Sequence, residues 1–307
     1  MTTPQAQPRP DIDIVNPNGQ VSVREVVSGT LYFRQPHLSM RQEVADCIRR
    51  FFALVPAGGL EYHYDYDGEQ DDINDAILAR VLHERFFGPD SFPNASLHME
   101  GTGLYAPAYF LEYLGSANDN PDLPNEAGTL QLWMPRAFFV EHRAKVLGFF
   151  AEAFATLPFS CGQIGLALSG EDKQRKQALA ARYPGLDIAE PRCVSTDIGD
   201  KAGGVAWQTL LGPSLTASLG GPKAIALALA APTVVEALPS GGVRITAEPE
   251  PRLGDVNRHD LLPSHRQVAQ LLDASAQLHV PERVVYFQDR TGMADLDAMQ
   301  QWHRRWL

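Results

Sequence analysis

Basic residues are scarce in this chain of 307 residues. Its 26 Lys and Arg are outnumbered by 37 Asp and Glu, which gives a formal net charge of -11. A protein that holds a nucleic-acid backbone needs a basic face to neutralise phosphates. The composition therefore argues against a nucleic-acid partner and favours a basic protein as partner.

Long hydrophobic runs and paired cysteines are also missing. No stretch approaches the ~20 apolar residues of a membrane span, so no membrane partner is expected. Cys47, Cys161 and Cys193 have no C-x-x-C spacing, and an odd count suits a reducing compartment. Residues 1–20 lack a basic segment followed by an apolar one, which predicts a disordered leader and no export signal. We therefore expect a cytoplasmic protein.

Common catalytic motifs are absent as well. The sequence has no G-x-S-x-G elbow, and SLGGPK (Ser218–Lys223) lacks the glycine spacing and the hydroxyl residue of a phosphate-binding loop. Cys161 precedes an apolar strand, which favours a small core residue over a reactive thiol. We predict no catalytic residue, no cofactor and no metal ion, and hence a protein that is not an enzyme.

An internal repeat is the most informative feature that is present. Gly29–Gly68 and Gly128–Gly170 both begin with GTL, and each has a Pro seven residues after its first Gly. Each copy predicts a strand, a helix and a strand, and a further helix follows, at Asp72–Phe87 and Asp172–Tyr183. The pattern indicates a duplicated β-α-β-α unit, residues 29–87 and 128–183, in an α+β fold with a mixed β-sheet covered by helices.

The helices of the two copies have matching apolar stripes. A capping box of Ser39 and Gln42 is predicted to start the first helix. Alternation in LEYHYDYD is expected to expose Glu61, His63, Asp65 and Asp67 on a wet strand face. The first stripe is Met40, Val44, Cys47, Ile48, Phe51 and Phe52, and the second is Phe139, Val146, Leu147, Phe150 and Phe154.

Residues 195–307 are expected to be a helical and hairpin extension that packs onto the sheet, within a single domain of residues 21–307. We predict a helix from Trp207 to the glycines Gly220 and Gly221, and a second helix from Pro222. A hairpin at 234–246, a helix after Pro263, a strand at Arg283–Phe287 and an amphipathic tail helix with Trp302 and Trp306 follow.

Two polar stretches are chemical candidates. PRLGDVNRHDLLPSHRQVAQLL (Pro251–Leu272) has two His and two Asp, but its spacing matches no helical metal-ligand pair, which favours a solvated turn before a helix. EYHYDYDGEQDDIND (Glu61–Asp75) has seven acids and no Lys or Arg. It departs from a calcium loop because His63 and Asn74 occupy the two end ligand positions. A solvated strand end, with Asp71 and Asp72 at a helix start, or an acidic patch that docks a basic partner fits better.

The C-terminal half resembles the type VI immunity protein family of Gram-negative bacteria. The resemblance rests on VAWQTLLGPSLTASLGG (Val205–Gly221), on PSGGVRITAEPEPRLGDVNRHDLLPSHRQVAQLL (Pro239–Leu272) and on RYPGLDI (Arg182–Ile188), and it covers about the last 130 residues. The residues that match the family pattern include Trp207, Gly212, Pro213, Gly220, Gly221, Gly254, Asp255, Pro263 and Arg266.

The resemblance implies a cytoplasmic antitoxin that neutralises an effector toxin of the type VI secretion system, with a DNA-cleaving enzyme as the expected toxin. The matching residues resemble fold-making positions and do not locate the toxin-binding surface. Dense carboxylates suit the basic cleft of a nuclease, so we take Asp65, Asp67, Glu69, Asp71 and Asp72 as the candidate toxin-binding residues.

Two alternatives remain open at this point. One is a metal-dependent hydrolase that uses His63 with Asp65 and Asp67, or His259 with Asp260. The other is a structural adaptor of secretion. The sequence also leaves the existence of a homodimer open.

Overall fold

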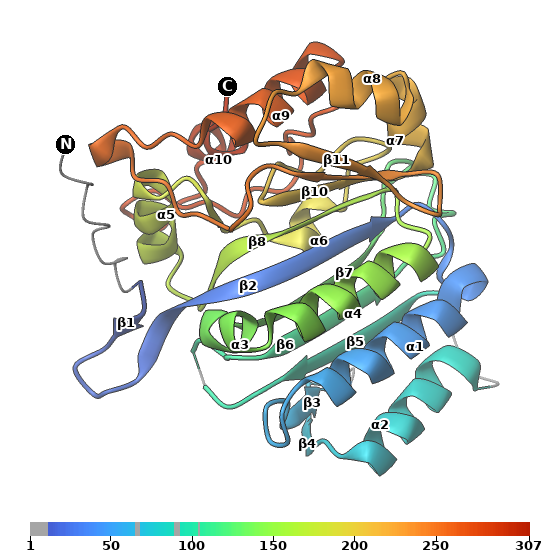
Figure 1. The fold of residues 1–307 in the computed structure, drawn as a ribbon. Helices are drawn as coiled ribbons and strands as arrows, with labels where there is room; N and C mark the ends of the chain where they lie inside the picture. The colour runs from blue at the N-terminus through green and yellow to red at the C-terminus, as the bar shows by residue number, and fades with distance from the viewer. Residues whose placement is uncertain (1–11, 65–67, 89–92, 104) are drawn as a thin grey trace.

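One twelve-stranded sheet forms the centre of the computed structural model, which describes residues 12–64, 68–88, 93–103 and 105–307 (Figure 1). The order of strands across the sheet is β11-β12-β10-β8-β2-β7-β6-β5-β3-β4, with β1 paired to β2 and β9 to β8. Among the described strands, only β8 and β9 pair in parallel, so the sheet is mixed through that pair alone. The predicted α+β class is confirmed.

The strands range from two to thirteen residues. Their bounds are Ile14–Val15 (β1), Val21–Phe33 (β2), Tyr62–Tyr64 (β3), Gln70–Asp72 (β4), Ala95–Glu100 (β5), Phe110–Gly115 (β6), Gly128–Pro135 (β7), Cys161–Ser169 (β8), Leu186–Asp187 (β9), Gln208–Leu211 (β10), Val234–Ala237 (β11) and Val243–Thr246 (β12).

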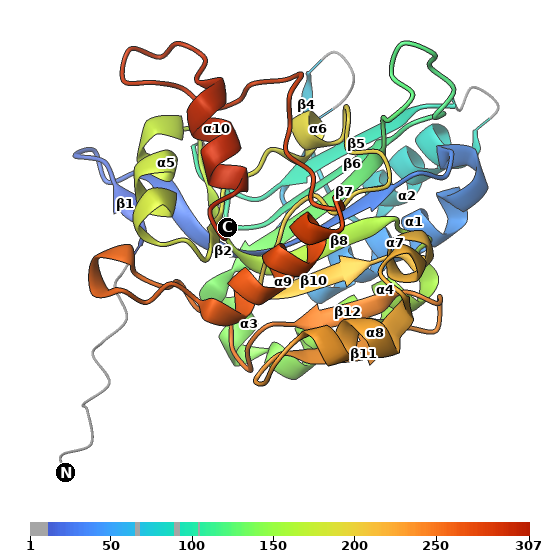
Figure 2. The same ribbon diagram turned by 90° about the horizontal axis from the view of Figure 1, so that it is seen from above.

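Helices lie on both sides of the sheet. In Figure 1, α1 to α4 lie in front of it, and Figure 2 shows α5, α6 and α10 on the opposite side. The bounds are His37–Leu54 (α1), Asp75–Leu82 (α2), His83–Phe87 (η1), Arg136–Glu141 (α3), Arg143–Thr156 (α4), Lys173–Arg182 (α5), Pro191–Val194 (α6), Pro213–Ser218 (α7), Gly221–Ala228 (α8), Val256–Arg258 (η2), Pro263–Ala274 (α9) and Leu296–His303 (α10).

The predicted repeat has a counterpart in the pairing of β2 with β7. Leu31 lies opposite Leu130, while Gly29 lies opposite Leu132 and Phe33 opposite Gly128. Residues that occupy equivalent places in the two GTL segments therefore exchange positions across a local two-fold axis. The following helices pack against each other, with the rings of Phe51 and Phe149 at 5.7 Å. The copies differ beyond this point, because the β5–β6 hairpin separates β3 from β7 whereas β8 lies directly beside β2.

Several expectations about helix ends and strand faces are wrong. Helix α1 begins two residues before Ser39, whose hydroxyl donates to the carbonyl of Pro36 at 2.7 Å instead of capping the helix. His63 is 2% exposed because its side of β3 faces the core. Asp71 and Asp72 lie in strand β4, and α2 begins at Asp75 with the Asn74 side chain as its cap.

The extension also differs in part from the prediction. Gln208–Leu211 is a strand and not the start of a helix, since it fills the place between β8 and β12 and tertiary pairing overrides the helical pattern. Arg283–Phe287 forms no strand. The β11–β12 hairpin, the start of α9 at Pro263 and the buried Trp302 and Trp306 agree with expectation.

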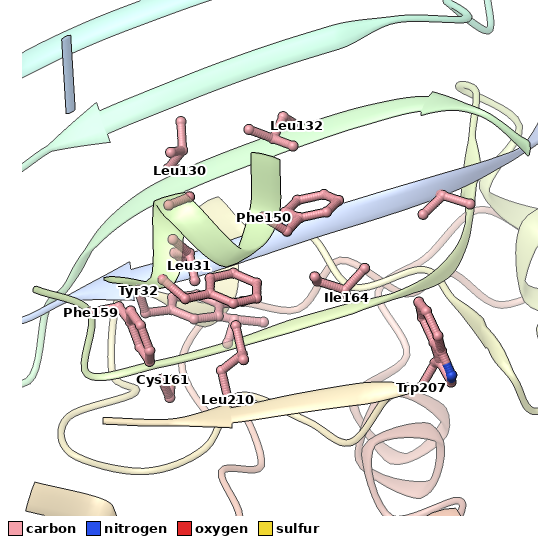
Figure 3. Close-up of a cluster of buried hydrophobic side chains, with 14 of the residues drawn as sticks. Leu31, Tyr32, Leu130, Leu132, Phe150, Phe159, Cys161, Ile164, Trp207 and Leu210 are labelled. Atoms are coloured by element: carbon pink, nitrogen blue, oxygen red, sulfur yellow. The ribbon is translucent and has the colours of Figure 1, made fainter. Parts of the chain in front are cut away.

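A close contact between sheet and helix lies at the centre of the core. Phe150 of α4 points onto β2, β7 and β8 among Leu31, Leu130 and Ile164 (Figure 3). The ring approaches so closely that a Cβ built on Gly29 would lie 2.4 Å from its Cε1 atom. Gly29 is therefore required by this packing rather than by its backbone conformation.

We predict that Gly29→Ala lowers the free energy of unfolding by roughly 1–3 kcal/mol, because the added methyl group overpacks the core against the buried Phe150 ring. The matched control is Gly148→Ala on the exposed side of α4, where nothing lies within 4 Å of the new Cβ. Alanine there should add about 1 kcal/mol through helix propensity. Urea unfolding curves of both variants test the pair, and equal stabilities would contradict the close contact.

Candidate functional site

The acidic stretch forms one end of the sheet. We use the name acidic hairpin for the exposed carboxylates Glu69, Asp71 and Asp72 of the β3–β4 pair. Asp71 and Asp72 lie in β4, the last strand in the sheet order, and Glu69 directly precedes that strand, whereas Asp65 and Asp67 lie outside the described residues. Asp71 forms an ion pair with Arg80 of α2 at 3.6 Å, with both side chains about half exposed.

Beside the acidic hairpin, one sheet face remains partly open to solvent. In-register pairing across β4, β3, β5, β6 and β7 sets two rows of side chains on this face, because paired residues share a side. Their neighbours along the strands, such as Leu97 and Leu111, point to the core. The open face consists of Asp72, Tyr62, Glu100, Phe110 and Trp133 in one row and Gln70, Tyr64, His98, Glu112 and Gln131 in the other.

A network of charged groups centred on His98 crosses the open face. The Nε2 atom of His98 lies 3.3 Å from Glu100 and its Nδ1 atom lies 3.7 Å from Glu112. The Tyr64 hydroxyl donates to Glu100 at 2.7 Å, and the Arg192 guanidinium donates to Glu112 at 2.8 Å. Both carboxylates are thus held from two sides.

The network fixes the charges of its members. Burial alone would lower the pKa of His98, but its two carboxylate neighbours outweigh burial and raise that pKa to about 9. Burial would raise the pKa of Glu100 and Glu112, yet contacts with His98 and with Tyr64 or Arg192 lower both. Near neutral pH the imidazolium and both carboxylates are therefore charged together.

Two hollows border the open face. One, of about 220 Å³, is lined by Trp133, Lys176, Glu190 and their neighbours on β6–β8 and α5–α6. The other, of about 460 Å³, is lined by Ser96, Leu114, Glu126 and others. Arg192 lines both hollows. The Trp133 ring beside the first hollow stacks on Phe110 with a centroid distance of 3.9 Å and an interplanar angle of 11°.

The glycines and the tryptophan of the predicted family motif occupy structural positions. Trp207 is buried against Phe139 and donates its indole N–H to the carbonyl of Glu248 at 2.6 Å. A Cβ on Gly212 would lie 2.5 Å from the carbonyl oxygen of Phe159. Gly220, Gly221 and Gly254 adopt left-handed backbone conformations, with φ of 85°, 86° and 64°.

The remaining motif residues stabilise helix ends and loops. Pro213 and Pro263 occupy the first turns of α7 and α9. Asp255 pairs with Arg182 at 3.2 Å, and Arg266 donates to the carbonyl of Leu307 at 2.8 Å. The Pro251–Leu272 stretch is only partly solvated, since His265 is buried and burial lowers its pKa to about 3.

The residues of the hydrolase alternative are not assembled as a site in the described part of the chain. His63 is on the core side of β3, and His259 is exposed while Asp260 pairs with Arg252 at 2.7 Å. The described residues contain no group of three His, Cys, Asp or Glu placed to hold a metal ion. Burial raises the pKa of Cys161 to about 12, so this thiol stays protonated in the core.

Comparison with known proteins identifies the family. Residues 43–306 match the family TsiV, described as type VI immunity for VRR-NUC, and the chain belongs to that family. No curated protein matches it. Among solved structures, the Pseudomonas aeruginosa T6SS protein PA0821 is similar in fold, with a TM-score of 0.79 and 18% identity over 96% of this chain and 87% of that one. Across the described residues, none of the helices has the length and apolar character that a membrane crossing requires.

Apart from Asp72, the open face was not among the predicted site residues. The signal that could have revealed it is the alternation in ASLHME (Ala95–Glu100), FLE (Phe110–Glu112) and TLQLWM (Thr129–Met134), where polar or aromatic residues alternate with aliphatic ones or methionine. Alternation shows that a strand has two different faces. It does not show which strands become neighbours.

We predict that Glu112→Gln lowers the pKa of His98, because one of the two carboxylates that stabilise the imidazolium is lost. The stability that a raised His pKa contributes is complete below about pH 6.5 and is lost as the pH rises through about 9. The variant should therefore be less stable than the native protein at neutral pH and approach its stability above pH 9. An NMR titration of the imidazole and melting curves across this range measure both effects. A native His98 that titrates near its ordinary value would disprove the network.

Proposed function

We propose that this protein binds a VRR-NUC effector nuclease and neutralises it by stoichiometric occlusion in the cytoplasm, without chemistry of its own. Membership of the immunity family supports the pairing with such an effector. The observation that carries the mode of binding is the placement of Glu69, Asp71 and Asp72 as exposed carboxylates at one end of the sheet.

Electrostatics explains why such a surface suits a nuclease. An enzyme that acts on DNA needs a cationic cleft for the phosphate backbone, and clustered carboxylates are complementary to that cleft. Long-range attraction accelerates encounter between oppositely charged proteins by a factor of 10 to 1,000 at low salt. Fast capture matters because an antitoxin must bind the nuclease before the nuclease cuts DNA.

Stoichiometric occlusion has a direct test. The purified protein, mixed with the VRR-NUC effector encoded beside it, should elute with the effector in a fixed ratio. DNA cleavage should fall linearly with added protein and reach zero at that ratio. Inhibition at far lower ratios would indicate turnover and contradict occlusion.

We predict that the triple variant Glu69→Lys, Asp71→Lys, Asp72→Lys lowers the association rate constant by about tenfold or more at low salt, with a smaller effect at moderate salt. The control is Glu43→Lys, Glu141→Lys, Asp273→Lys, which reverses three exposed carboxylates on α1, α3 and α9. It changes the net charge equally but leaves the acidic hairpin intact. Stopped-flow association measures both variants, and equal rate constants for the two would eliminate the acidic hairpin as the steering surface.

A further inference from the structure

We infer that the open face is the anchoring surface for the effector, and that its occupant is an effector segment that carries arginine or lysine side chains. The inference rests on the proposed function and assigns to it a second, adjoining surface that shares Asp72 with the acidic hairpin. The observation behind it is the juxtaposition of in-register aromatic and acidic side chains with two hollows on one partly exposed sheet face.

The chemistry of the open face selects a cationic occupant. Its ten residues include the carboxylates of Asp72, Glu100 and Glu112, against the single imidazolium of His98. The aromatic rings of Tyr62 and Trp133 lie in the same row as Asp72 and Glu100. A guanidinium or ammonium group gains both from a carboxylate and from the face of a neighbouring ring.

The open face is also rigid enough to bind without reorganising. Its side chains are on paired strands, Phe110 and Trp133 are stacked, and Glu100 and Glu112 each have two partners. Tyrosine and tryptophan contribute large contact areas at a small cost in side-chain entropy, which explains their enrichment in binding hot spots. The binding geometry is therefore present before the partner arrives.

Arg192 of α6 lies beside the open face and is the cation that the effector displaces. Its side chain is 67% exposed and borders both hollows, whereas its partner Glu112 is 12% exposed. Because it is costly to leave the largely buried Glu112 carboxylate without a cation, Arg192 leaves it only in exchange for another cation. A cation of the effector can then take its place on a carboxylate that is already oriented.

The two surfaces should act on different rate constants. The acidic hairpin is exposed and speeds encounter, whereas the half-buried open face holds the bound partner and limits dissociation. Removing charge from the hairpin should change association, and removing contacts from the open face should change dissociation.

The decisive variant is Tyr62→Ala combined with Glu112→Gln, tested on the full chain with a catalytically inactive VRR-NUC effector in surface plasmon resonance. We expect the dissociation rate constant to rise at least tenfold while the association rate constant changes less than about threefold. The matched control is Tyr109→Ala with Glu141→Gln. These residues also lie side by side, but Tyr109 packs on Phe138 of α3, at the helix-covered side of the sheet.

Three further results decide between the possible outcomes. Arg192→Ala should leave the dissociation rate constant unchanged or lower it, because the substitution removes a competing cation. Faster dissociation would mean that the occupant is acidic, which would overturn the inference. If the double variant fails to fold, as judged by its melting curve, Tyr62→Ala alone must speed dissociation. Failure of the native protein to bind the effector overturns the proposed function itself, while native binding with unchanged dissociation in the open-face variants overturns only this inference.

Discussion

The structure depends on the pairing of β2 with β7 on one side and with β8 on the other. These three strands fix the local two-fold relation of the GTL segments, in which Leu31 meets Leu130. They also provide the floor on which Phe150 packs, and the absence of a side chain at Gly29 permits that approach. Every other strand of the described sheet adds outward from this centre.

The same arrangement explains why one face of the sheet remains partly open to solvent. Helices α1 and α4 follow the two GTL strands and pack against each other on one side of the sheet, so that side is covered. The β5–β6 hairpin then extends the sheet from β7 toward β3. On the face opposite α1 and α4, helices α5, α6 and α10 reach only part of the strands (Figure 2). Strands β5 and β6 consequently direct Leu97, Met99 and Leu111 inward and His98, Glu100 and Glu112 outward.

Much of this fold could be predicted from the sequence, because the repeat, the apolar stripes of the two helices and the turn residues of the β11–β12 hairpin are local signals. Predictions failed where long-range pairing decides the outcome. Gln208–Leu211 has a helix-like context but becomes a strand between β8 and β12, and His63 is buried because β5 and β4 flank its strand. The open face depends on the register of strands far apart in sequence, and the sequence of a single strand does not determine that register. Charge density is local, which is why the acidic hairpin could be predicted as a candidate surface.

Fold-making residues and the residues that we propose to face the partner occupy separate parts of this molecule. Trp207, Gly212 and Gly254 serve the core and its turns, where a changed side chain would meet backbone or break a buried hydrogen bond. Tyr62, Tyr64 and Glu112 project from strands whose opposite face already supplies the packing. A substitution on the open face therefore alters charge and shape toward a partner with little loss of core contact. An immunity protein built in this way can change the effector it recognises while its fold stays the same, because the proposed binding side chains contribute little to the core.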